Sequence, residues 1–167
     1  MPNPSIEPAE PAAPPPPALG PGGVPKALLA ALRDGDFEAL ETLLAPDVWL
    51  RNLLVKQLHE STTAADAVEA FRSWVGSPHG AVMLDCEHRS LANRELLRYR
   101  FLVRPVWAPD DWHVLEQTGY CRVKDGRISR LDLACTGYFP ADEAGVPAET
   151  MAAAQREAVA AAERTAA

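Results

Sequence analysis

The sequence of 167 residues has no excess of positive charge, and its formal net charge of -7 argues against a nucleic-acid partner. It contains no apolar run near the ~20 residues that span a bilayer, so we expect no membrane partner. It also lacks the basic start and apolar run of a cleavable secretion signal. These absences leave small molecules and other protein chains as the partners to consider.

Cysteine is scarce: Cys86, Cys121 and Cys135 are the three present, and all lie in strand-like runs. This odd number favours buried thiols in a reducing cytoplasm over a disulfide framework. The histidines are scattered and lack the ligand spacing to cysteines or carboxylates that metal sites show, so we expect no metal and no cofactor. The glycines at 20–23 follow no strand and form no phosphate loop, and we find no nucleophile motif.

Proline and alanine divide the chain into three parts. Residues 1–23 hold most of the 16 prolines and little that could be buried, so we expect a disordered tail. Residues 24–140 have the length and apolar content of one domain. Residues 141–167 are rich in alanine and predict a helix, which packs on the domain, pairs with a partner chain or frays.

The domain begins with two helical patterns. Leu28, Leu29 and Leu32 repeat at helical spacing before a break at residues 34–36, and a second apolar set follows that break. This second set is Phe37, Leu40, Leu43 and Leu44. A strand is predicted next, at residues 48–54.

The rest of the domain is predicted to be mostly strands. A short strand is expected at residues 55–60, and Thr63 with Asp66 is typical of a capping pair for a helix that ends before Gly76. Four long strands follow, at residues 81–91, 96–106, 112–123 and 127–136. Because the breaks between them are short and turn-like, we expect antiparallel neighbours and an α+β fold.

Alternation along the four long strands separates an inner, apolar face from an outer, charged face. We assign these residues to the inner face: Val82, Leu84, Cys86, His88, Tyr99, Phe101, Val103, His113, Leu115, Gln117, Gly119, Cys121, Val123, Leu131, Leu133 and Cys135. Charges of both signs lie on the outer face, among them Asp85, Glu87, Arg98, Arg100 and Asp132. Since these charges can pair across strands, they predict a solvated face or the interface of a homodimer.

The inner face carries few polar residues: Asn52, His88, Tyr99, His113 and Gln117. Apolar walls with a few convergent polar groups are typical of small-molecule sites. An inner histidine costs free energy unless it is hydrogen-bonded, so His88 needs a partner in a packed core, such as Tyr99 or Gln117, or a ligand. His113, near the start of its strand, can lie at the rim, and His59 either flanks the pocket mouth or is solvated.

Residues 28–47, with their helix, Gly35-Asp36 break and Ala45-Pro46-Asp47 turn, resemble ketosteroid isomerases. The resemblance resumes at residues 66–71 and 82–93 and covers most of the domain. It implies the nuclear-transport-factor-like (SnoaL-like) fold, in which a cone-shaped, curved, mostly antiparallel sheet wraps around N-terminal helices and encloses one pocket.

The resemblance does not extend to the catalytic groups of the isomerases. Their base carboxylate falls at Asn52, their tyrosine donor at Leu28 and their aspartate donor at Gly119, so we do not expect steroid isomerisation. SnoaL-type polyketide cyclases share the fold, but their acid–base aspartate near the last strand has no inner match, since Asp132 faces out.

Scytalone dehydratase, a further enzyme with this fold, is similar around its catalytic histidine. Gln-His in that enzyme matches Glu87-His88, its substrate-holding asparagine falls at Gln117, and one of its water-positioning tyrosines falls at Asn52. The aspartate that orients its histidine falls at Arg33. A dehydratase-like mechanism therefore requires Asp34 or another acid to orient His88.

These patterns and the resemblance predict a cofactor-independent acid–base enzyme, a dehydratase, cyclase or isomerase, acting on a small, hydrophobic, oxygenated ring compound. His88 would be general acid or base, because an imidazole exchanges protons near neutral pH, and Tyr99 would assist it. The predicted substrate contacts are Asn52, Gln117, His113, Phe101 and Leu131. The Ala-rich, Arg-over-Lys composition is typical of GC-rich bacteria and favours secondary metabolism. The alternative is a non-catalytic small-molecule-binding or dimeric assembly module.

Overall fold

The computed structural model describes residue 19 and residues 22–166, and the tail predicted for residues 1–23 lies almost entirely outside this range. The described elements are α1 (Gly23–Asp34), α2 (Phe37–Leu43), β1 (Leu44–Leu53), β2 (Leu58–Ser61), α3 (Ala64–Val75), β3 (Ala81–Leu91), β4 (Arg94–Val103), β5 (His113–Lys124), β6 (Arg127–Pro140) and α4 (Ala148–Ala166). Within the described residues, no helix is both long enough and apolar enough to cross a membrane.

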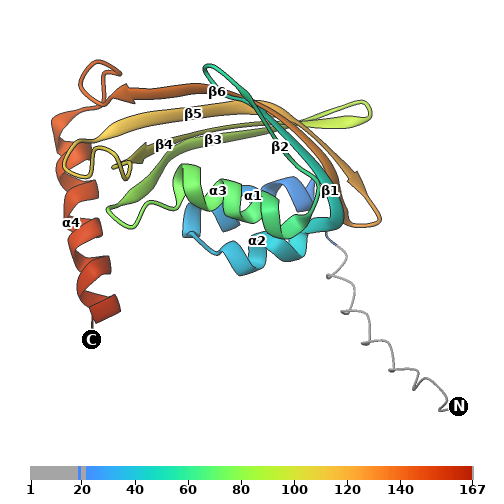
Figure 1. Cartoon of the computed structure of the whole chain (residues 1–167), viewed down its shortest axis with the longest axis horizontal. Helices are drawn as coiled ribbons and strands as arrows, with labels where there is room; N and C mark the ends of the chain where they lie inside the picture. The colour runs from blue at the N-terminus through green and yellow to red at the C-terminus, as the bar shows by residue number, and fades with distance from the viewer. Residues whose placement is uncertain (1–18, 20–21, 167) are drawn as a thin grey trace, which may run out of the picture.

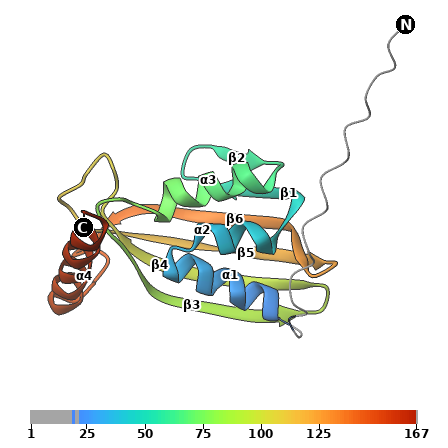
Figure 2. The same ribbon diagram turned by 90° about the horizontal axis from the view of Figure 1, so that it is seen from below.

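All six strands belong to one sheet, in the order β2-β1-β6-β5-β4-β3. Neighbouring strands are antiparallel except β1 and β6, which are parallel. The sheet curves around α1, α2 and α3 on its concave face, and α4 stands at one end of the sheet (Figures 1 and 2). The predicted α+β fold, a curved and mostly antiparallel sheet wrapped around the N-terminal helices, is confirmed.

The helix signals in the sequence act as predicted. Gly35 ends α1 in the left-handed conformation, with φ of 66°, and the side chain of Asp36 then caps α2 by accepting a hydrogen bond from the Ala39 N–H at 2.9 Å. Thr63 caps α3 by accepting from the Asp66 N–H at 3.1 Å. These caps fix where the helices begin and end over the sheet.

The centre of the cone is packed with side chains. Leu28 and Leu32 of α1 and Phe71 of α3 are buried in one cluster with Tyr99 and Phe101 of β4. Burying such large side chains stabilises the fold by roughly 1.5–3 kcal/mol each. The space between the helices and the middle of the sheet is therefore largely filled by side chains.

The face assignment on β3 was wrong for Val82 and Leu84. The pairing of β3 with β4 shifts register between Met83 and Asp85, and the extra residue of such a bulge reverses the alternation. Met83 therefore packs into the main core, whereas Val82 and Leu84 pack against a second cluster on the outer face. Cys86 stays in register with the inner residue Tyr99, as assigned, but its side chain is exposed.

The second cluster joins the C-terminal segment to the outer face. It contains Leu102 and Val114 of the sheet and Ala141, Val146 and Ala154 of the segment that leads into α4. Of the three possibilities left open for this segment, packing on the domain is the one observed. Figure 1 shows α4 at the end of the sheet where β3 begins.

Candidate functional site

The structure separates two residues that the sequence placed in one site. On the inner face Asn52 pairs with Leu133, Leu133 with Gly119, Gly119 with Leu97, and Leu97 with His88. These five residues form one row across the sheet, with Asn52 on β1 and His88 on β3. Neighbouring strands lie about 4.8 Å apart, so four strand spacings separate Asn52 from His88. The two side chains do not converge on one small ligand.

His88 has a carboxylate partner, which is Glu95 of β4. The His88 Nε2–H donates to Glu95 Oε2 at 2.7 Å, and the Ser90 hydroxyl donates to the same oxygen at 2.7 Å. The hydrogen bond from Ser90, followed by that from His88, lowers the pKa of Glu95. Asp34, which we considered for this role, instead bonds Arg33 at 2.9 Å.

The prediction missed Glu95 because it began the second long strand, which is β4 of the structure, two residues too late, at residue 96. The strand in fact starts at Arg94, and Glu95 shares the inner face with Leu97 and Tyr99. Extending the alternation by one step toward the turn would have identified it.

Gly22, the residue just before α1, lies over the imidazole of His88. A Cβ built on Gly22 would lie 2.7 Å from His88 Cε1, so only a glycine backbone can approach so closely. The side chains of His88 and Glu95 are 10% and 20% exposed. Glu95 can orient the imidazole of His88 for proton transfer. This pair lies at the edge of the sheet, because β3 is an edge strand.

A second polar group lies in the middle of the inner face. The Tyr99 hydroxyl donates to Gln117 Oε1, and both residues are buried. Burial raises the pKa of Tyr99 well above its ordinary value, so the phenol stays protonated as a donor. Among the described residues, Gln117 Nε2 and both amide atoms of Asn52 have no hydrogen-bond partner, although both residues are 0% exposed.

A hollow of about 310 Å³ lies at the open end of the cone, beside these amides. It is lined by Leu54, Val55, Lys56, Gln57, Trp74, Leu115, Cys135, Gly137 and Tyr138. We call it the mouth pocket. Gln117 is the direct strand neighbour of the lining residue Cys135, and Asn52 lies two residues before the lining residue Leu54 in the chain. Neither amide residue is itself part of the lining.

Burial keeps the Tyr138 phenol and the Cys135 thiol of the mouth pocket neutral. Burial raises the pKa of Tyr138 to about 12, and its hydroxyl donates to the Trp74 carbonyl at 3.1 Å. Burial likewise raises the pKa of the Cys135 thiol. Lys56 is the one charged residue in the lining. The pocket is therefore suited to an uncharged ligand.

His113, predicted at the rim, and His59, predicted either at the pocket mouth or in solvent, both lie near aromatic residues of this pocket. His113 is 8% exposed, donates from Nδ1 to the Asp111 carbonyl at 3.1 Å and packs edge-on against Trp107, which also contacts Tyr138. His59 packs edge-on against Trp74 with ring centroids 5.3 Å apart.

Two predicted substrate contacts, Phe101 and Leu131, lie in the main core. The structure thus joins Tyr99 to Gln117 but does not gather all the predicted residues around one cavity.

The outer face is charged, and most of its charges pair within the chain. Arg98 contacts Asp85 at 3.0 Å and Glu116 at 2.9 Å, and Arg100 contacts the same two carboxylates. We call these four residues the paired network. Because the partners belong to one chain, the network needs no second copy, and the homodimer stays a prediction.

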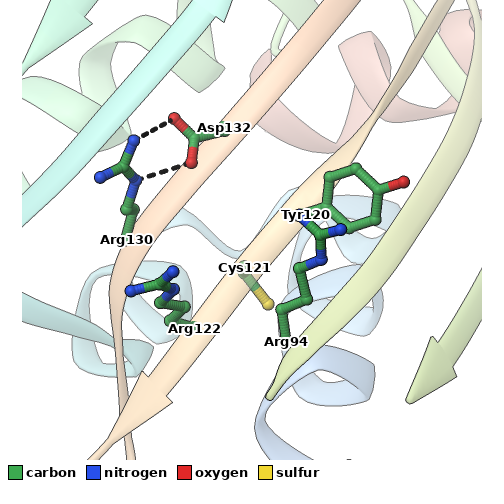
Figure 3. A pocket seen from close by; sticks show the side chains of 6 residues that line it. All are labelled: Arg94, Tyr120, Cys121, Arg122, Arg130 and Asp132. Carbon is green, nitrogen blue, oxygen red and sulfur yellow. Dashed lines mark hydrogen bonds and ion pairs between the residues drawn. The ribbon is translucent and has the colours of Figure 1, made fainter. Parts of the chain in front are cut away.

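A second hollow, of about 290 Å³, lies on the outer face near the hairpin ends of the sheet. Figure 3 shows the six residues that line it: Arg94, Tyr120, Cys121, Arg122, Arg130 and Asp132. Among the residues that the structure describes, no group of three or more histidines, cysteines and carboxylates could hold a metal ion.

No protein-family model matches the sequence, and no curated protein matches it significantly. Solved structures do share the fold. A nuclear-transport-factor-2-like protein of unknown function from Mesorhizobium loti superimposes with a TM-score of 0.56 at 19% identity, over 68% of this chain and 88% of that chain. A proposed polyketide cyclase from Xanthomonas campestris gives 0.53 at 19% identity, over 67% and 87%.

An epoxide hydrolase of the LEH-like type from M. tuberculosis gives a TM-score of 0.50 at 16% identity, over 67% of this chain and 79% of that chain. At such identities the likeness establishes the fold. The chain has the nuclear-transport-factor-like (SnoaL-like) fold that its sequence predicted.

Proposed function

We propose that this protein binds a small, uncharged, largely apolar compound in the mouth pocket and holds a carbonyl or hydroxyl oxygen of that compound with the buried amides. The observation that carries this proposal is the pair of buried amides, Gln117 and Asn52, without protein partners for Gln117 Nε2 or for either amide atom of Asn52. A buried polar group left without a partner costs about 1–3 kcal/mol. A ligand oxygen offsets that cost.

The hydrogen bond from Tyr99 determines whether Gln117 offers a donor or an acceptor to the ligand. Since Gln117 Oε1 already accepts the Tyr99 hydroxyl, the free Nε2 of Gln117 is a donor. The ligand group must then be an acceptor, such as a ketone, ester or hydroxyl oxygen. Solved structures with this fold include a proposed polyketide cyclase and an epoxide hydrolase, whose names also concern small oxygenated compounds.

The test compares two probes of the same shape, 1-tetralone and the hydrocarbon tetralin, by isothermal titration calorimetry. We expect wild type to bind the ketone about 10-fold more tightly, as one hydrogen bond to a buried donor implies. Gln117→Leu should bind both probes equally, and Thr118→Val, the outer neighbour, should keep the preference. Equal affinities of the two probes for wild type would contradict the proposal.

A second candidate function is proton transfer by His88, and the observation that favours it is the 2.7 Å contact with Glu95. A carboxylate that fixes the tautomer and orientation of an imidazole is the arrangement that general acid–base catalysis uses. Such chemistry would act on a compound bound beneath α1, because His88 lies away from the mouth pocket. The product class would be that of a dehydratase, cyclase or isomerase.

On a confirmed substrate, His88→Gln should reduce turnover by about 10²–10⁴ with little change in binding. Glu95→Gln should reduce turnover less, since the imidazole remains. Full activity of a folded His88→Gln variant would exclude this second function and leave the binding function as it stands.

A further inference from the structure

Three arginines lie side by side on the outer face, at the end of the sheet opposite α4. Arg122 of β5 pairs directly with Arg130 of β6, and Arg130 pairs with Trp49 of β1. On the other side of β5, Glu95 pairs with Cys121, so the next antiparallel step places Arg94 beside Arg122. We call Arg94, Arg122 and Arg130 the arginine row.

The charges of this row are not balanced. Arg130 is bound by Asp132, with contacts of 2.7 and 3.2 Å. Within the described part of the chain, Arg94 and Arg122 have no carboxylate within 4.0 Å. Like charges directly opposite each other destabilise a sheet. In a chain with a net charge of -7, this local excess of positive charge is unexpected.

Aromatic rings hold the two outer guanidinium groups of the row in place. The guanidinium of Arg94 lies over the ring of Tyr120 at 4.2 Å, and that of Arg130 lies over Trp49 at 4.6 Å (Figure 3 shows Arg94 with Tyr120). A guanidinium that stacks on a ring keeps its N–H edge free for an oxyanion. Arg94 and Arg130 are therefore held in place before any ligand arrives, which reduces the entropic cost of binding.

The hollow of about 290 Å³ lies directly over the row, and Tyr120, Cys121 and Asp132 complete its lining. We propose that it is a binding site for the phosphate group of a small soluble molecule, with Arg94 and Arg122 contacting the phosphate oxygens and Arg130 at the edge. Two guanidinium groups without counter-charges match a group that carries about two negative charges, and their paired N–H donors match its oxygens. This site lies on the opposite face of the sheet from the mouth pocket, and it does not depend on the function proposed above.

The test titrates inorganic pyrophosphate into the full chain at low ionic strength, followed by isothermal titration calorimetry. We expect saturable binding that weakens as salt is added, because the contacts are between charges. Arg122→Glu should weaken binding by at least about 10-fold, since it removes one charge-assisted contact and adds a repulsion. Arg94→Gln should weaken it less. Arg156→Glu, an exposed site on α4 with the same change in charge, should leave it within about 2-fold.

A parallel arm separates a soluble ligand from a lipid headgroup. The protein is sedimented with vesicles of phosphatidylcholine, with and without phosphatidylglycerol. Pyrophosphate binding that Arg122→Glu abolishes, without vesicle binding, supports the proposal. Three results would overturn it: no saturable binding up to about 10 mM, equal loss in Arg122→Glu and Arg156→Glu, or binding to anionic vesicles but not to pyrophosphate. Far-UV circular dichroism checks that each variant is folded.

Discussion

The two faces of the sheet carry polar side chains of different kinds. In the middle of the inner face the polar groups of Asn52, Tyr99 and Gln117 are uncharged and buried, and Gln117 Nε2 and both amide atoms of Asn52 lack protein partners. On the outer face the polar groups are charged and partly exposed, and most are balanced by contacts such as that between Arg98 and Glu116. Each face has one exception to balanced polar contacts. On the inner face it is the pair of buried amides, and on the outer face it is the arginine row.

These two exceptions are informative because an unpartnered polar group costs more free energy on the inner face than on the outer face. Behind the mouth pocket no solvent compensates an amide, so an unpartnered one costs free energy directly. On the outer face water screens an unbalanced arginine, and the cost is a few tenths of a kcal/mol. Substitutions at a site on the inner face should therefore change the free energy of unfolding. Substitutions at a site on the outer face should mainly change how that free energy depends on salt.

The largest difference between the faces is expected at two adjacent residues of β5. A Cβ on Gly119 would overlap the Asp132 carbonyl of the neighbouring strand, so Gly119→Ala should lower the free energy of unfolding by about 3 kcal/mol or more. Thr118→Ala, on the outer face, should change it by less than about 1 kcal/mol. Urea denaturation measures the free energy of unfolding of both variants. Similar decreases in the two would show that β6 moves to accommodate the new methyl group.

The next difference concerns the unpartnered amide of Asn52. Asn52→Leu keeps a side chain of similar size and removes the buried polar atoms, so it should raise the free energy of unfolding by about 1–2 kcal/mol. Arg98→Leu, on the outer face, should lower it, because Asp85 and Glu116 lose a partner. A destabilised Asn52→Leu variant would mean that the fold itself satisfies this amide.

A pH-dependent difference is expected at Glu95. Its pKa is lowered in the folded protein by the hydrogen bonds from Ser90 and His88, so its stabilising contribution is complete above the ordinary value of 4.5 and is lost as the pH falls through the lower folded value. Glu95→Gln should therefore lower the free energy of unfolding by about 1 kcal/mol at pH 7, and the gap to wild type should close as the pH falls below 4.5. Denaturation from pH 3 to 8 checks this, and a gap that widens toward acid pH would contradict the assignment.

The smallest effects should have opposite signs at the arginine row and at the paired network of the outer face. Arg122→Thr removes a like-charge neighbour of Arg130 and should raise the free energy of unfolding by about 0.3–0.5 kcal/mol. Glu116→Gln weakens the paired network and should lower it by a similar amount. Both effects should vanish in about 1 M salt. If Arg122→Thr instead lowers the free energy of unfolding, the positive charges of the arginine row are already compensated within the folded chain.

The local signals of the sequence determined the elements of this protein. Gly35 and Asp36 broke the first helix, Thr63 with Asp66 began the third, and alternation located the long strands. These features depend on residues within a few positions of one another, so the chain itself contains the information. For the same reason the outward position of Arg98 and the inward position of Gln117 could be assigned without a structure.

The tertiary structure alone decided which residues meet. The bulge at Met83 reversed part of one strand, the register of β4 brought Glu95 to His88, and the order of strands placed Asn52 at the other end of the row. Strand order and register are set by packing between segments far apart in the sequence, and a shift of one residue changes every face. The sequence therefore specified the kinds of polar groups on each face, and the pairing of the strands determined that they form separate sites.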